Sequence, residues 1–379
     1  MNSVELFAGG GGLALASSLS GFKHSFLVEW DKDSAKTLKQ NISELHLRSV
    51  SSIFNGDIQS VDFSKYSGKI DLLSGGPPCQ PFSIGGKAKA YNDQRDMFPE
   101  AARALAEIKP KAFIFENVRG LLRKNFAKYF GYIILQLTYP EIRRKENQTW
   151  EEHLSILEKH QTSRSYYKGL KYNVVFRLVN AADYGIPQKR ERVFIVGFRS
   201  DIKGEWSFPE PTHSKEALEY AKYVSGEYWK KHSIPFKQKN NGSLNIPFDS
   251  NKKPWVTVRD VLSDLLEPNK RGIRIPNHIV QPGARQYAGH TGSLLDEPSK
   301  TIKAGAHGVP GGENMVVLDD GSVRYYTVRE AARIQTFPDN YIFPCSWTES
   351  MRQIGNAVPV QLGKIVADSV ARMLKNAEK

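Results

Sequence analysis

Cysteine is scarce in this chain: Cys79 and Cys345 are its two cysteines, and they form no CxxC pair. Two distant thiols indicate a reducing compartment, so neither a disulfide framework nor a zinc site is expected. The sequence also lacks any run of 18 apolar residues, which argues against a membrane-spanning helix. The first residues, Met1–Glu5, lack the basic start of a signal peptide. We therefore expect a cytoplasmic protein with no membrane partner.

Internal repeats and low-complexity tracts are absent as well. The 379 residues are 40% apolar, which is enough for a folded core and leaves room for one large domain or two. The formal net charge is +13 and the pI is about 9.4. A positive field of this size suits a polyanionic partner, although it also serves solubility. Charge alone leaves DNA, RNA and acidic lipid open.

The first 30 residues follow the order strand, glycine turn, helix and strand. An apolar strand at 3–8 runs into four glycines at 9–12, and residues 13–19 are compatible with a helix. This order is typical of the first unit of a nucleotide-binding α/β sheet. A second strand at 26–28 ends in Glu29, which can accept hydrogen bonds from ribose hydroxyls. Trp30 can stack on a purine, although a solvated acid beside a core aromatic remains an equal alternative.

The glycine turn lacks strict dinucleotide spacing, and no lysine follows it for a triphosphate. A nucleoside without phosphates therefore fits better than NAD or ATP. A helix is expected at 34–45, and a third strand region ends at 55–58. Asp57 can bond an exocyclic amine there, but taken alone it is more typical of a turn.

The chain is organised around the segment Gly75–Ser83, which contains two glycines, three prolines and Cys79. The preceding apolar run at 70–73 indicates a short buried parallel strand. Proline fixes the backbone and glycine permits close approach, so such a loop holds a side chain at the carboxyl edge of a sheet. An isolated cysteine is usually a buried small hydrophobe, but rarely in such a turn. The unpatterned stretch 84–99 that follows predicts an active-site lid, or simply a mobile surface loop.

Two further segments place charged side chains beside buried strands. A helix at 99–108 leads to a strand at 112–115, and Glu116 follows at the same predicted sheet edge as Cys79. A strand at 174–179 precedes the charged run 188–192, which enters another strand at 193–198. That run is either a salt-bridge network or a means of directing an arginine at the Cys79–Glu116 site.

The remaining segments differ in texture. Residues 132–170 look inserted, with a surface helix at 150–159. From residue 200 onward the alternation of predicted strands and helices ends, and prolines, asparagines and aromatic residues take its place. Between Lys230 and Arg285 there are 11 Lys/Arg against 4 Asp/Glu, which suits a grip on a nucleic-acid backbone. The glycine-rich stretch 283–316 includes His307, expected to be structural. Helices are expected at 327–335, with Thr327 and Glu330 at capping-box spacing, and at 360–374.

A cysteine, a glutamic acid and an arginine around a flat heterocycle suit one kind of chemistry. A thiolate adds to an electron-poor ring carbon, and a carboxylic acid protonates or hydrogen-bonds the ring nitrogen. Nearby cations favour the thiolate, and partial burial makes the protonated acid accessible near neutral pH. Carbon 6 of cytosine is such a target, and carbon 5 then attacks an activated methyl group. Because the ring is hidden in a base stack, the base must be flipped out.

Five short motifs occur in the order found in DNA (cytosine-5) methyltransferases, and the chain resembles a compact bacterial member of that family. By these motifs the match covers roughly 1–130, 171–199 and 325–379, leaving 132–170 and much of 200–320 outside. The motifs are Phe7–Gly11, Pro77–Gln80, Glu116–Val118, Gln188–Arg192 and Gly355–Val358.

The resemblance implies that Cys79 is the nucleophile and that Glu116 contacts ring nitrogen 3 and the amino group. It also implies that Arg192, with Arg190 nearby, supports the base and the activated intermediate. The implied cofactor is S-adenosylmethionine, with S-adenosylhomocysteine as the product. The residues implied to bind it are Phe7, Ala8, Gly9, Gly10, Gly11, Leu13, Glu29, Trp30, Asp57, Ile58, Gly76, Pro77, Met97, Asn356 and Ala357.

The implied fold class is α/β: a Rossmann-like methyltransferase fold with a mostly parallel sheet, helices on both faces, and a smaller irregular target-recognition domain. Residues 1–199 and 350–379 are expected to form the catalytic domain, and 200–349 the target-recognition domain with its hinge. Residues 80–99 are the implied closing loop. Expected partners are double-stranded DNA and a cognate restriction endonuclease, for a monomer associated with the nucleoid. Two alternatives remain open: a tRNA cytosine methyltransferase, and a catalytically inactive DNA-binding regulator.

Overall fold

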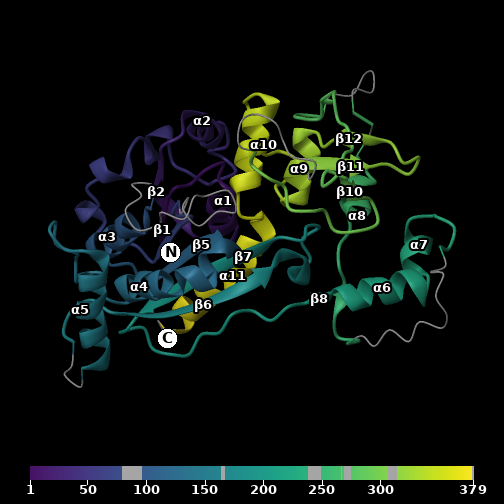
Figure 1. Ribbon diagram of the computed structural model, residues 1–379. Coiled ribbons are helices and arrows are strands. Elements are labelled where there is room, and N and C mark those ends of the chain that lie inside the picture. Colours follow the sequence, from purple (N-terminus) through teal and green to yellow (C-terminus); the bar gives the residue numbers. More distant parts are fainter. Residues whose placement is uncertain are drawn as a thin grey trace. The chain divides into compact units, whose positions relative to one another are not determined.

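The computed structural model describes residues 1–78, 96–163, 167–237, 249–265, 267–268, 275–305 and 314–377. Cys79, the predicted lid up to residue 95 and His307 lie outside these ranges. The chain divides into two compact units (Figure 1). Within the described ranges, none of the helices combines the length and the apolar character needed to cross a membrane. The first unit contains Met1–Val179, Glu191–Phe208 and Gly363–Lys379, and the second contains Asn180–Arg190 and Pro209–Leu362.

The first unit is built on a seven-stranded sheet with the order β3-β2-β1-β4-β5-β7-β6. The pairs from β3 to β5 are parallel, whereas β7 runs antiparallel to β5. The carboxyl ends of the parallel strands therefore share one edge of the sheet. The strands are β1 (Asn2–Leu6), β2 (Lys23–Glu29), β3 (Ile53–Asn55), β4 (Leu72–Gly75), β5 (Ala112–Val118), β6 (Tyr172–Asn180) and β7 (Glu191–Arg199).

Three helices cover one face of this sheet: α3 (Phe98–Ile108), α4 (Ala127–Thr138) and α5 (Trp150–Thr162). Their apolar side chains form one buried cluster with alternate strand residues such as Leu73 and Phe115. The expected surface helix at 150–159 is confirmed: Trp150 and Leu157 lie on its buried face, and residues such as Glu151 and Lys159 are exposed. A capping box at Thr149 and Glu152 begins this helix.

The opposite face carries α1 (Gly12–Leu19) and α11 (Val360–Ala377), which are joined where Ser20 Oγ donates to Lys364 O. Side chains alternate between the faces of a strand, so the strand residues beneath α1 are a separate set. They are unusually polar: Ser74 Oγ donates to the Glu5 carboxylate at 2.7 Å, and His24 Nε2 lies 2.7 Å from Ala14 O. Burial raises the pKa of Glu5 to about 8, so this carboxyl is held in conditions that favour its neutral form.

The predicted strands and helices of the first unit are confirmed within one or two residues at most ends. The helix predicted at 34–45 is α2 (Lys32–Gln40), which begins earlier because the Asp31 side chain caps it by accepting from Ser34 N. It ends at Asn41, and the chain then turns through His46, whose φ of 50° lies in the left-handed region. Propensity alone does not reveal that turn.

The second unit consists of short elements joined by irregular chain. A three-stranded sheet, β10-β11-β12, and a two-stranded sheet, β8-β9, are its ordered strands among the described residues. The capping box predicted at Thr327 and Glu330 is confirmed, although most of the unit's helices were not predicted. The elements are β8 (His213–Ser214), α6 (Lys215–Tyr223), α7 (Glu227–Lys231), β9 (Lys253–Pro254), α8 (Val258–Leu262), β10 (Ser293–Leu294), β11 (Met315–Val317), β12 (Val323–Tyr325), α9 (Val328–Ile334) and α10 (Trp347–Asn356).

Candidate active site

Glu116 and Arg192 form a buried ion pair at the carboxyl edge of the sheet. Glu116 lies near the end of β5, and Arg192 lies on the antiparallel neighbour β7, opposite Val118. Arg192 Nε is 2.8 Å from Glu116 Oε1, and their side chains are 12% and 8% exposed. Burial lowers the pKa of Arg192 from its ordinary value, and the Glu116 carboxylate offsets part of that shift. A carboxylate and a fixed guanidinium are thus held together with little access to water.

The end of β5 is also bonded to the segment that leads to Cys79. Asn117 Nδ2 donates to Pro77 O at 2.9 Å. A Cβ added at Gly76 would lie 3.6 Å from Glu116 Oε2, which is ordinary van der Waals contact. The described chain stops at Pro78, whose carbonyl accepts a hydrogen bond from Met97 N at 3.1 Å. Pro78 and Met97, which lie on either side of the undescribed residues 79–95, are therefore hydrogen-bonded to each other.

The glycine turn after β1 is held by Glu29 at the end of β2. Glu29 Oε2 accepts from Gly9 N at 2.6 Å, and Oε1 accepts from Asp31 N at 2.7 Å. Phe7, Gly9 and Gly11 all have positive φ, at 54°, 54° and 87°. Glycine adopts this backbone conformation without strain, which accounts for glycine at positions 9 and 11.

Other predicted cofactor residues lie at the same edge. The Trp30 side chain is 68% exposed, while Asn55 Nδ2 donates to the carbonyls of Glu29 and Trp30. Asp57 caps a short turn, because its side chain accepts a hydrogen bond from Gln59 N at 2.9 Å. This is the contact expected of a turn residue. Ile58 is buried.

Arg190 belongs to the second unit, and its contacts differ from those of Arg192. The side chain is fully buried and donates to three backbone carbonyls: Ile302 at 3.1 Å, Gly355 at 2.7 Å and Ala357 at 2.9 Å. Ala357 follows α10, whose last residue is the exposed Asn356. The observed contacts of Arg190 hold backbone carbonyls in place. Its predicted role on the base stays a prediction.

The predicted site residues therefore divide between the units. The first unit contains Glu116, Arg192 and most of the predicted cofactor residues, and the second contains Arg190, Asn356 and Ala357. Sequence reasoning missed three amides that organise these regions, although Asn117 and Gln188 stand inside quoted motifs. Asn117 bonds Pro77. Gln188 and Gln335 bond each other at 3.1 Å, and Gln335 also bonds Ile354 O at 2.6 Å.

The chain matches the model of the C-5 cytosine-specific DNA methylase family over residues 1–139 and 153–372. The resemblance is therefore wider than the five motifs predicted, since it takes in 200–320 and leaves only 140–152 unmatched between its two parts. The chain is similar in fold to S. pombe Dnmt2 (17% identity, TM-score 0.57, 99% of each chain). It is also similar to the Entamoeba histolytica methyltransferase EhMeth (16% identity, TM-score 0.55, 100% of this chain and 99% of that one).

Two bacterial relatives share a higher identity with this chain. Type II methyltransferase M.PspPI of Psychrobacter sp. is 34% identical over 99% of this chain and 80% of that protein. Type II methyltransferase M.FnuDI of Fusobacterium nucleatum is 31% identical over 100% of this chain and 96% of that protein. The chain therefore belongs to the C-5 cytosine-specific DNA methylase family and is a DNA (cytosine-5) methyltransferase.

Proposed function

We propose that this enzyme methylates a flipped-out cytosine within a specific duplex site, using Cys79 as nucleophile and Glu116 as the acid on the base. The observation that carries this proposal is the buried Glu116–Arg192 pair beside Gly76 and Pro77. That pair lies beside Gly76, and the neighbouring Asn117 is hydrogen-bonded to Pro77, two residues before Cys79, which supports the pairing of Cys79 with Glu116.

Membership of a methyltransferase family implies use of S-adenosylmethionine, and the glycine turn fits that molecule. The exposed Trp30 indole offers a flat face for a purine, and the Glu29 carboxylate lies beside the glycine turn, bonded to Gly9 N. We assign the adenosyl part to these residues. When bound, the sulfonium supplies an electrophilic methyl group. The other residues predicted to bind the cofactor are Phe7, Ala8, Gly10, Gly11, Leu13, Asp57, Ile58, Gly76, Pro77, Met97, Asn356 and Ala357.

Side chains of this protein supply the nucleophile and the acid for the reaction on the base. The Cys79 thiolate forms a bond to carbon 6, while Glu116 donates a proton or hydrogen bond to ring nitrogen 3. The electron pair then gathers at carbon 5, which takes the methyl group. Loss of the carbon 5 proton to a base re-forms the double bond and expels the thiolate, and ring nitrogen 3 returns its proton to Glu116. Arg192 holds the Glu116 carboxyl in place throughout.

The names of the relatives support a wider proposal. M.PspPI and M.FnuDI are Type II methyltransferases, so we propose that this enzyme protects cellular DNA from a cognate restriction endonuclease. The second unit, which contains the basic segment between Lys230 and Arg285, is the part we assign to target recognition, with the enzyme acting as a monomer on cytoplasmic DNA. Residues 200–349 remain the predicted target-recognition domain.

Transfer of a labelled methyl group to duplex DNA and to tRNA tests the proposal. We expect label in duplex DNA only, at one sequence context in bisulfite sequencing of DNA from expressing cells. Cys79→Ala is expected to abolish transfer while leaving S-adenosylhomocysteine binding within about twofold, since it removes the nucleophile alone. Label in tRNA only, no label in any duplex, or full activity of Cys79→Ala would each contradict the proposal.

A further inference from the structure

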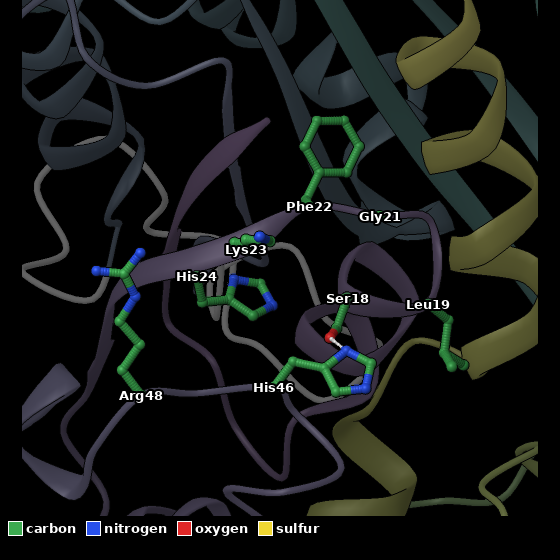
Figure 2. A pocket seen from close by; sticks show the side chains of 8 residues that line it. All are labelled: Ser18, Leu19, Gly21, Phe22, Lys23, His24, His46 and Arg48. Atoms are coloured by element: carbon green, nitrogen blue, oxygen red, sulfur yellow. Dashed lines mark hydrogen bonds between the residues drawn. The ribbon is translucent and has the colours of Figure 1, made fainter.

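A cavity of about 490 Å³ opens in the first unit, away from the residues described above (Figure 2). Its walls come from the last turn of α1, the turn at Gly21, the start of β2 and the segment after α2. The first residue of β2 is Lys23 and the last is Glu29. At about 3.3 Å per residue, roughly 20 Å of strand separates this cavity from the carboxyl edge of the sheet. A duplex bound at Glu116 lies at that other edge.

The ionisable side chains that line the cavity are all basic: Lys23, His24, His46 and Arg48. Burial lowers the pKa of His24 to about 4, so its ring is neutral and the positive charge comes from the other side chains. Lys23 and Arg48 are exposed, and within the described chain neither has a carboxylate at ion-pair distance. Two cations therefore stand at the cavity with no protein anion to neutralise them.

The rest of the wall is apolar or already satisfied. Leu19 is 42% exposed and Phe22 is buried. The His46 ring is fixed by Ser18, whose Oγ lies 2.8 Å from Nδ1 (Figure 2). The cavity sits at the carboxyl end of α1, where free carbonyls would repel an anion. Those carbonyls are occupied, since Ser17 O accepts from Phe22 N and Ser18 O accepts from Gly21 N.

From this arrangement we propose that the cavity is a second binding site, for a small phosphate ester with a flat apolar body. Its volume is in the range of small-molecule pockets, about 300–1,000 Å³. Lys23 and Arg48 meet the phosphate oxygens, and Leu19 and the His46 ring contact the apolar body. The site is separate from methyl transfer and does not depend on it.

Binding of phenyl phosphate tests the proposal. Inorganic phosphate and phenol, which represent its two halves, serve as comparison ligands. Binding is measured by calorimetry or ligand-observed NMR on the full chain, with the cofactor pocket saturated by S-adenosylhomocysteine. We expect saturable binding of phenyl phosphate with a Kd on the order of 1 mM, and at least about tenfold weaker binding of either half. No saturation by about 20 mM, or equal affinity for all three probes, would overturn the site.

The double variant Lys23→Met and Arg48→Met removes both charges while keeping apolar stems. We expect its Kd for phenyl phosphate to rise about tenfold, in line with two partly exposed charge pairs. The matched control is Lys145→Met and Lys159→Met, two exposed lysines of the same unit that lose the same charge. An equal loss of affinity in the control variant would mean that the protein's net positive charge attracts the phosphate, and would overturn the proposal.

Two readouts on the same samples separate this result from misfolding or from DNA binding. The double variant is expected to keep its thermal midpoint and its methyl transfer to duplex DNA, because the cavity is remote from Glu116. If duplex DNA displaces phenyl phosphate, and the double variant abolishes that displacement, the cations bind DNA backbone and the small-molecule site is wrong.

Discussion

Arg190 and Arg192 are two residues apart in one motif, yet they serve two different regions. Arg192 is on β7 in the first unit and pairs with a carboxylate. Arg190 precedes that strand, belongs to the second unit and binds the carbonyls of Ile302, Gly355 and Ala357. Both are buried arginines, so burial alone does not reveal function. Their partners differ: Arg192 pairs with a carboxyl group, and Arg190 donates to backbone carbonyls.

This difference separates two kinds of mutational effect. Changes at the Glu116–Arg192 pair should reduce the chemical step in a protein that still folds. Changes at Arg190 should reduce stability, because buried carbonyls lose their donors. The same substitution at the two arginines is therefore an internally controlled experiment.

The largest effect is expected from Glu116→Gln. It keeps the shape of the side chain but removes the acid, so kcat should fall about 10²–10⁴-fold. Single-turnover methylation of duplex DNA measures this loss. Binding of S-adenosylhomocysteine serves as the control and should change little. An unchanged single-turnover rate would remove Glu116 from the mechanism.

A smaller loss is expected from Arg192→Lys. A lysine keeps the charge but not the fixed direction of the guanidinium, so kcat should fall about 10²-fold while KM changes less. The pairing with Arg190→Lys sharpens the result. If the two variants show the same ratio of kcat loss to stability loss, the proposed division between the arginines is wrong.

Arg190→Met is expected to act on stability. Several buried carbonyls lose their donor at once, so the free energy of unfolding should fall by about 3–5 kcal/mol. Chemical denaturation measures that loss, and kcat per folded molecule should stay within about tenfold of the parent. A fully stable variant with abolished turnover would instead give Arg190 a direct place on the base.

The last prediction concerns the pH dependence of stability and Glu5, beneath α1. Its pKa is raised to about 8 in the folded protein by burial, from 4.5. The folded state therefore binds more protons than the unfolded state between these values, and this contribution to stability declines as pH rises from about 4.5 to about 8. Glu5→Gln cannot ionise, so its stability relative to the parent should improve over that window and level off above it. Thermal midpoints from pH 5 to pH 9 check this, and a constant difference would contradict the raised pKa.

Much of the first unit followed from its sequence because local signals and packing agree there. The strands ending at Glu29 and Glu116 read as apolar runs with an acid at the end, and the structure places both acids at the carboxyl edge. The division between Arg190 and Arg192 could not be predicted, since spacing along a chain does not show where one unit ends and another begins. Buried hydrogen bonds such as the one from Asn117 to Pro77 join residues far apart in the sequence, so hydrophobic periodicity does not predict them.

The second unit was predicted in outline only. Its helices are short, from five to ten residues among those described, and amphipathic patterns of that length barely rise above chance. Thr327 and Glu330 were the exception, because a capping box is a local bond between fixed positions. The roles predicted for Cys79 and for the cofactor residues stay predictions.

Trapping the enzyme on a duplex containing 5-fluorocytosine tests the Cys79–Glu116 mechanism most directly. Fluorine at carbon 5 cannot leave as a proton does, so the methylated base should stay bonded to the protein in denaturing gels. The account predicts a stable adduct at Cys79 for the parent and for Arg190→Lys, a much slower one for Glu116→Gln, and none for Cys79→Ala. An adduct that forms in Cys79→Ala, or at the parent rate in Glu116→Gln, would contradict it.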